Sequence, residues 1–239
     1  MFLLVNFPVL AYRPFGTEDA GVAGKGVVQA EASFDYLKWN DGTAENVFVV
    51  VPIYGLTDNI ELSAELPYML HRPAAGALES GAGDINLVMK YLLASEGECS
   101  PAFAVKGVAK LDNGDFSRGL GSGDKDYSFF GVASKTFDRF IIHSHLGYAW
   151  VGKSQNAALR DISLFGLAVD CALTDACHLL AEINGNRHPD STATEDPRNW
   201  LVGISNKLSD KLIWDFAGRG GLSMASPDWS LTTGLSATL

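Results

Sequence analysis

The chain has 239 residues, of which 47% are hydrophobic and 19% charged, so it carries enough apolar surface for a large core and is not an intrinsically disordered chain. Its formal net charge of −10, with no run rich in Lys or Arg, argues against a nucleic-acid partner, because phosphate binding needs clustered cations. The longest apolar stretch after the N-terminus, residues 47–53, is far shorter than the roughly 20 residues of a membrane-spanning helix, which excludes a helical membrane protein.

The N-terminal residues divide into two expected segments. Residues 1–11 are apolar and end in a small residue, like the tail of a secretory signal peptide, although no basic stretch precedes them. We therefore expect an exported protein and leave these residues out of the fold; an ordinary buried strand is the alternative. Residues 12–24 contain too many Gly and Pro for a strand or a helix, so they predict a separate N-terminal segment before a folded domain over residues 25–239.

Twelve segments of around ten residues follow that are typical of β-strands. Seven of them alternate polar and apolar residues with period two, the pattern of a strand with one apolar face: residues 27–38, 60–71, 84–93, 102–111, 140–150, 211–220 and 228–239. Five more are strand-like but mixed, and the faces of residues 159–172 stay unassigned: residues 44–55, 126–136, 159–172, 177–186 and 198–207.

The connections between these strands alternate in length. Short turns rich in Asp, Asn, Ser and Thr, whose side chains bond the local backbone, fall at residues 56–59, 96–98, 137–139, 173–176 and 208–211. Longer, polar, mostly Gly-rich connections fall between them, at residues 72–83, 112–125, 152–158, 187–197 and 221–227. Outer-membrane barrels show this asymmetry, with short periplasmic turns and longer outer loops. An even number of strands then leaves both termini on the periplasmic side.

These patterns predict an all-β, antiparallel, up-and-down transmembrane β-barrel of about twelve strands in a bacterial outer membrane. A soluble sandwich or a lipocalin-like barrel would also alternate, but twelve up-and-down strands exceed the usual eight, and a packed soluble core would not tolerate a charged face. Aromatic residues near the strand ends of the apolar face fit an interfacial girdle: Tyr36, Trp39, Tyr68, Trp150, Trp200, Trp214 and Trp229.

The polar face of the strands is expected to line the lumen. Its charged and imidazole residues are Glu31, Asp35, Glu61, Glu65, Asp84, Lys90, Lys106, Lys110, His143, His145, Glu182, Asp215 and Arg219. Twelve strands enclose a space between the filled eight-strand barrel and the open sixteen-strand porin. Two interpretations therefore stay open: an ion-pair network that fills a narrow barrel, or a polar channel crossed by a transverse field.

The N-terminal segment also has two possible fates. Chain ends usually fray, so it can be a mobile tail. Alternatively, Arg13, Glu18 and Asp19 could pair with lumen charges and Phe15 could bury inside the barrel. The segment would then act as a plug that narrows the periplasmic exit.

No catalytic constellation stands out in the sequence. The nucleophile-elbow, Walker and His-Glu-x-x-His motifs are all missing. His143 and His145 share one face, but no Cys or carboxylate is fixed beside them, so a hydrogen-bonded pair is favoured over a metal site. We expect no catalytic residue, no metal and no cofactor. Cys99, Cys171 and Cys177 fall near the periplasmic rim, where a disulfide is permitted, but their pairing stays open.

Several turn motifs resemble one known family of outer-membrane proteins. These are residues 13–20 (RPFGTEDA) with 24–26, residues 52–58 leading into 65–68, and residues 110–115 with 119–123. Over residue 13 to the C-terminus the chain resembles the MetA-pathway phenol-degradation-like outer-membrane transporters. This resemblance implies a barrel that passes small, often hydrophobic or aromatic, molecules.

The sequence therefore predicts a porin-like, non-enzymatic outer-membrane channel for small solutes, with possible selectivity for hydrophobic or aromatic compounds. Its expected partners are outer-membrane lipid, a small-molecule solute and the barrel-assembly machinery of a Gram-negative bacterium. An outer-membrane barrel enzyme, such as a phospholipase, and a purely structural barrel are the alternatives. The enzyme would need Ser, His and a polar orienting group near one rim.

Overall fold

The computed structural model of the chain describes residues 13–155 and 158–239, so the expected signal-peptide tail, residues 1–11, lies outside the described residues. The described chain is built of β-strands and one short 3-10 helix, η1 (Phe116–Arg118). The strands are β1 (Val28–Lys38), β2 (Ala44–Gly55), β3 (Ile60–Arg72), β4 (Glu79–Ala82), β5 (Asn86–Ala94), β6 (Ala102–Lys110), β7 (Asp126–Phe137), β8 (Phe140–Trp150), β9 (Ile162–Ala172), β10 (Cys177–Asn186), β11 (Arg198–Ser209), β12 (Leu212–Gly221) and β13 (Trp229–Thr238). Within the described residues, no helix is long and apolar enough to cross a membrane.

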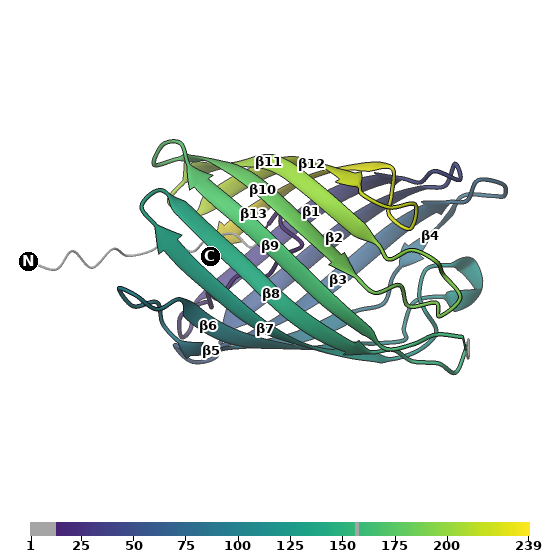
Figure 1. Cartoon of the computed structure of the whole chain (residues 1–239), viewed down its shortest axis with the longest axis horizontal. Helices are drawn as coiled ribbons and strands as arrows, with labels where there is room; N and C mark the ends of the chain where they lie inside the picture. Colours follow the sequence, from purple (N-terminus) through teal and green to yellow (C-terminus); the bar gives the residue numbers. More distant parts are fainter. Residues whose placement is uncertain (1–12, 156–157) are drawn as a thin grey trace, which may run out of the picture.

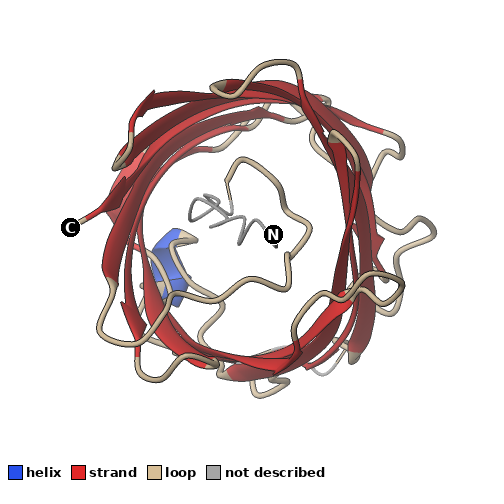
Figure 2. Ribbon diagram, turned by 90° about the vertical axis from the view of Figure 1, so that its left-hand side faces the viewer, coloured by secondary structure: helices blue, strands red, loops and turns tan. Residues whose placement is uncertain are grey.

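All strands except β4 form a closed antiparallel barrel (Figures 1 and 2). Each of these strands pairs with its chain neighbours, and β1 pairs with β13 to close the ring. The predicted twelve-strand up-and-down barrel is therefore confirmed. The short strand β4 was not predicted. It pairs only with the outer half of β3, within residues that the sequence indicated as a loop.

The wall has an apolar outer face and a polar inner face. On β5, the outward side chains of Leu87 and Met89 are 48% and 54% exposed, whereas Val88 between them and Lys90 after them are 7% and 3% exposed. The same alternation runs around the ring, because successive side chains of a strand point to opposite faces. Exposed apolar side chains on every strand of a closed barrel form the belt that contacts lipid in outer-membrane proteins.

The two ends of the barrel differ in the length of their connections. Figure 1 shows the short hairpin turns at the end where the C-terminus lies, and the long connections, with β4 and η1, at the opposite end. The turns between β7 and β8 and between β11 and β12 contain only two residues each, and in the first of them Asp138 adopts a positive φ of 53°. Asp tolerates this left-handed conformation better than most residues.

Labelling of single cysteines on intact cells should show which end faces outward. In a background with the native cysteines replaced by Ser, a membrane-impermeant maleimide should label cysteines at Ser117 and Thr192, which lie in long connections. Cysteines at Asp58 and Asp175, in short turns, should react only after cell lysis, because short turns face the periplasm. Labelling of the second pair alone on intact cells would invert the barrel.

Candidate functional site

The structure places the predicted lumen residues on the inner side of the wall. All of them except Asp84 lie on strands, and several are almost fully buried inside the barrel although they are ionisable, including Glu61, Lys90, Glu182 and Asp215. Asp84 precedes β5 rather than lying within a strand, which corrects the strand predicted to begin there. Burying charges without partners is expensive, so the contacts of these residues matter.

Many of these contacts are made with the N-terminal segment, which runs through the lumen (Figure 2). Its first described residue, Arg13, donates from Nη2 to Thr232 Oγ1 at 2.6 Å, and its Nε lies 3.5 Å from Asp215 Oδ2. Arg219 holds the next residue: its Nη2 donates to the Pro14 carbonyl at 2.7 Å, while Nη1 pairs with Asp35 Oδ1 at 2.9 Å. The segment therefore starts against β12 and β13.

The backbone N–H groups of the segment then bind wall side chains in succession. Gly16 and Thr17 both donate to Glu182 Oε2, at 2.8 and 3.1 Å. Glu18 N–H donates to His145 Nδ1 at 3.0 Å. This nitrogen is therefore the acceptor of the imidazole ring and carries no proton. A segment without secondary structure needs such partners, because its own backbone groups are not paired internally.

The predicted plug residues contribute charge pairs and a ring contact. Lys106 Nζ lies 2.6 Å from Glu18 Oε1, and Lys90 Nζ lies 3.7 Å from Asp19 Oδ2. The ring of Phe15 lies 6.1 Å, centroid to centroid, from that of His143. The segment thus brings opposite charges to Lys90 of β5 and Lys106 of β6.

The last part of the segment returns to the periplasmic end beside β2 and β3. Ala23 N–H donates to Glu61 Oε2 at 2.6 Å, and Lys25 N–H donates to Asp58 Oδ1 at 3.3 Å. Gly55 must be a glycine, because a Cβ there would collide with the Gly24 carbonyl. The segment therefore crosses the lumen from β12 to β3 and is tied to the wall at both ends.

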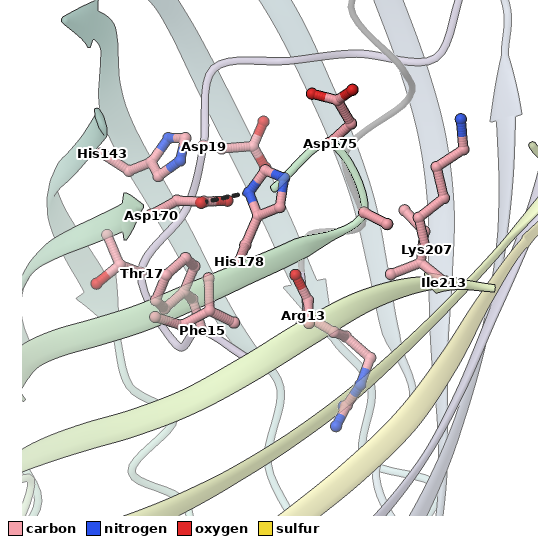
Figure 3. A pocket seen from close by; sticks show the side chains of 13 residues that line it. Arg13, Phe15, Thr17, Asp19, His143, Asp170, Asp175, His178, Lys207 and Ile213 are labelled. Carbon is pink, nitrogen blue, oxygen red and sulfur yellow. Dashed lines mark hydrogen bonds and ion pairs between the residues drawn. The ribbon is translucent and has the colours of Figure 1, made fainter. Parts of the chain in front are cut away.

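Two cavities adjoin this segment. The smaller, of about 60 Å³, lies toward the periplasmic turns (Figure 3), and among its lining residues His178 Nδ1 bonds Asp170 Oδ1 at 2.6 Å. Asp170 was missed in the sequence because the faces of residues 159–172 could not be assigned. Asp170 follows Gly166 and Ala168 at every second position on the inner face of β9, and this alternation would have been the only signal.

The larger cavity, of about 240 Å³, is lined by both apolar and polar side chains. Its apolar lining is Val49, Val51 and Ile53 of β2, which lies between β1 and β3, and Val88 of β5. Its polar lining consists of carboxylates, hydroxyls and ammonium groups of β1, β3, β5 and β6: Glu31, Ser33, Glu61, Ser63, Glu65, Lys90 and Lys106. Arg13, Phe15 and Glu18 of the segment complete its lining. The cavity is therefore amphipathic.

Asp84 organises the outer mouth. Its carboxylate accepts N–H bonds from Gly114 and Ser122 at 2.9 and 2.8 Å, and Lys110 Nζ lies 3.2 Å away. The connection between β6 and β7 is thereby folded over, and it buries Leu120, which is 2% exposed. At the far end of the connection between β6 and β7, hydrogen bonds from the Ser154 hydroxyl and the Gln155 N–H hold the pKa of the Asp124 carboxyl below its usual range.

The three cysteines, Cys99, Cys171 and Cys177, are free thiols in the structure. His143 Nδ1 bonds Ser134 Oγ at 2.8 Å, so the two imidazoles of β8 are both hydrogen bonded.

The sequence of the chain matches the model of a known protein family. The model of the family described as "Putative MetA-pathway of phenol degradation" matches residues 11–239. The chain belongs to this family. The resemblance indicated by the turn motifs is thereby confirmed. No curated protein sequence matches the chain.

Solved structures show the same fold at low identity. An outer membrane channel from Pseudomonas putida F1 is 14% identical, with a TM-score of 0.73 over 95% of this chain and 100% of that chain. The β domain of the Bordetella autotransporter BrkA (9% identical, TM-score 0.53, 89% of this chain and 98% of that) is also similar. So is the translocator domain of the autotransporter NalP from Neisseria meningitidis (11%, 0.51, 90% and 89%). With its lipid-facing belt, the chain is a barrel of the bacterial outer membrane.

The family-like motifs fall on the parts of this member that shape the lumen. Residues 13–20 are the part of the N-terminal segment that crosses the barrel, and residues 110–115 and 119–123 form the connection folded over the outer mouth. Residues 52–58 and 65–68 lie on β2, its turn and β3, around the larger cavity.

Proposed function

We propose that this family member is a non-enzymatic channel for the diffusion of small solutes that carry both an apolar and a polar part, such as substituted single aromatic rings. The observation that carries the proposal is the amphipathic cavity within the lumen. A cavity of roughly 150 Å³ lined by apolar side chains can hold benzene. The larger cavity, of about 240 Å³, has room for one ring with a polar substituent.

The apolar and the polar lining residues of the cavity would act on different parts of such a solute. Val49, Val51 and Ile53 offer apolar contact to a ring, and Glu65 or Ser33 offers a hydrogen-bond partner to a hydroxyl group. The family description refers to phenol degradation, and the similar P. putida protein is named an outer membrane channel. Both support a channel over the phospholipase-like enzyme or the structural barrel. The exposed apolar belt supports outer-membrane lipid as a partner, and we also propose barrel-assembly machinery for insertion.

The segment over residues 13–23 is proposed to act as the plug of this channel. Its contacts reach β12, β10, β8, β6, β5 and β3, so it occupies the lumen across its width. Solutes would pass through the space that remains between the segment and the wall, and the many tethers would keep this space narrow.

Single-channel recording of the purified protein in planar bilayers tests the proposal. We expect small, sustained conductance steps in KCl, and uptake of small polar solutes by proteoliposomes. A folded barrel that conducts no ions and admits no solute would refute the channel.

The charge of the cavity should set ion selectivity. Replacing Glu65 by Lys should shift the reversal potential in a KCl gradient toward that of chloride, because the field of a narrow lumen concentrates counter-ions. The barrel should stay folded, since lumen substitutions tune selectivity. Asp210→Lys is the control: this side chain is 96% exposed in a periplasmic turn. Equal shifts in both variants would place Glu65 outside the conducting path.

A further inference from the structure

Strand β3 is joined to its neighbour β2 by an interrupted ladder. The two strands stay in register from Ala44↔Arg72 to Gly55↔Glu61, but the pairing lacks Val51 and Pro52. Pro52 lies opposite Ala64 in this register and has no N–H, so it cannot donate to the Ala64 carbonyl. Proline in sheets is otherwise confined to edges and bulges, and a barrel has no edges.

The other side of β3 is interrupted a few residues further along. Its inner half pairs with β5 up to Glu65↔Asn86, and its outer half pairs with β4 from Tyr68↔Ala82. Between these pairs, two residues of β3 face three residues before β5, which is a β-bulge. Pro67 lies within it and cannot donate to Gly83, whose carbonyl instead accepts from Asn113 Nδ2 at 2.9 Å.

These interruptions are specific to β3. Among the strand pairs that the structure describes, the other register shifts fall at strand ends, at Leu92/Ala94 and Lys207/Ser209. The β1–β2 ladder runs without a gap from Val28↔Tyr54 to Lys38↔Ala44, and the β7–β8 ladder from Tyr127↔Trp150 to Phe137↔Phe140. In lipid, backbone groups must be satisfied within the wall. The stretch over residues 64–67 is therefore the least strongly bonded part of the wall at mid-strand.

The amphipathic cavity lies directly behind this stretch. Val49 and Val51 of β2 and Ser63 and Glu65 of β3 line it, and along each strand they alternate with side chains that point outward. The junction between β2 and β3 is called the β2–β3 seam. On its lipid side Ala64, which has a small side chain, lies between Leu62 and Leu66. The N-terminal segment contributes Arg13, Phe15 and Glu18 to the lining of the cavity, and it is tied to the cavity-lining Glu61 through the Ala23 N–H.

We propose that the β2–β3 seam at Pro52 and Ala64 is a lateral exit, through which an apolar solute passes from the cavity into the hydrocarbon of the membrane. This inference rests on the channel function proposed above and adds a second route to it. A solute that has entered from outside meets the tethered segment below it and the weakest part of the wall beside it. An apolar solute gains by entering lipid, whereas ions and polar solutes do not and stay on the axial path.

Cross-linking the seam tests this proposal. In a variant with Cys99, Cys171 and Cys177 replaced by Ser, cysteines at Ile53 and Ser63, which lie directly opposite each other, are oxidised to a disulfide. Cysteines at Ser128 and Ala149, opposite each other in the uninterrupted β7–β8 ladder, are the matched control. Intact cells are assayed for uptake of radiolabelled toluene, and the purified proteins for KCl conductance.

Ile53 and Ser63 line the cavity, so the oxidised variant is compared with the same variant after reduction rather than with the parental protein. Oxidation should lower toluene uptake several-fold relative to the reduced form, with equal conductance in the two forms. The control disulfide should change neither. A second variant, Pro52→Val, supplies the missing N–H and should also lower toluene uptake with normal conductance. Toluene uptake that persists in both variants overturns the lateral exit while the channel stands. A parental protein with neither uptake nor conductance refutes the channel itself.

Discussion

Deletion of residues 13–22 should raise the single-channel conductance several-fold. These residues carry the contacts to Asp215, Glu182, His145, Lys106 and Lys90, so their removal empties the middle of the lumen. A twelve-strand barrel without this filling is wider than the eight-strand barrels that side chains fill alone. Planar-bilayer recording measures the change, and permeation of small sugars into proteoliposomes should rise with it.

A variant that loosens the segment without removing it refines this test. Glu182→Ala removes the acceptor of the Gly16 and Thr17 N–H groups, so it should give fluctuating conductance with open levels near that of the deletion. The control is Asp170→Ala, which is also buried inside the barrel but bonds His178 rather than the segment. Unchanged conductance in the deletion, with a barrel that keeps heat-modifiable migration on gels, would show that the segment does not restrict the pore.

Placing Arg at Leu87 should cost up to about 2–4 kcal/mol of unfolding free energy, the cost that a cation on the lipid face reaches at the membrane midplane. Leu87 is 48% exposed on the outer face of β5, opposite Ala64 of β3. Equilibrium unfolding by guanidinium in lipid vesicles measures the loss. The variant should also insert more slowly, because the charge must enter hydrocarbon.

The matched control lies on the neighbouring strand but on the other face. Glu65 is opposite Asn86, one residue from Leu87, and its carboxylate accepts from Asn86 Nδ2 at 2.7 Å inside the barrel. Glu65→Arg should cost much less than Leu87→Arg, since the new cation faces a polar lumen. Equal destabilisation by both substitutions would mean that the two faces have been assigned the wrong way round.

The sequence predicted the barrel well because most strands alternate cleanly. Segments such as residues 27–38 place Glu31 and Asp35 on one face and apolar residues on the other, and period two carries this directly into inside and outside. The prediction failed where both faces share one character. On β2, Val49, Val51 and Ile53 face inward while Phe48 and Val50 face lipid, so no alternation marked the apolar side of the cavity.

The lumen contacts could be predicted only in part. Charge indicated Arg13, Glu18 and Asp19 as partners of the wall, and the structure places each of them beside an opposite charge. The backbone donors of Gly16, Thr17 and Ala23 carry no sequence signal, because every non-proline residue has an N–H. Their acceptors, Glu182 and Glu61, were recognisable as inward residues but not as ligands of a peptide segment. Strand β4 escaped because pairing of four residues depends on the length of β3, which the pattern does not fix.

The bond between Arg13 and Thr232 joins positions 219 residues apart. Arg13, the first described residue of the chain, thus has its partner on the last strand, β13. This strand reaches its final position only when it pairs with β1 and closes the barrel. The N-terminal segment is therefore synthesised before the strands that it contacts, and it is among the last parts to reach its final position, since contacts of such separation require the rest of the chain to be ordered first. Until then its carboxylates and N–H groups must stay hydrated, and the nascent ring must remain open and water-filled. We therefore expect insertion into the membrane and filling of the lumen to be separate events, with a wider state of the barrel preceding the narrow one.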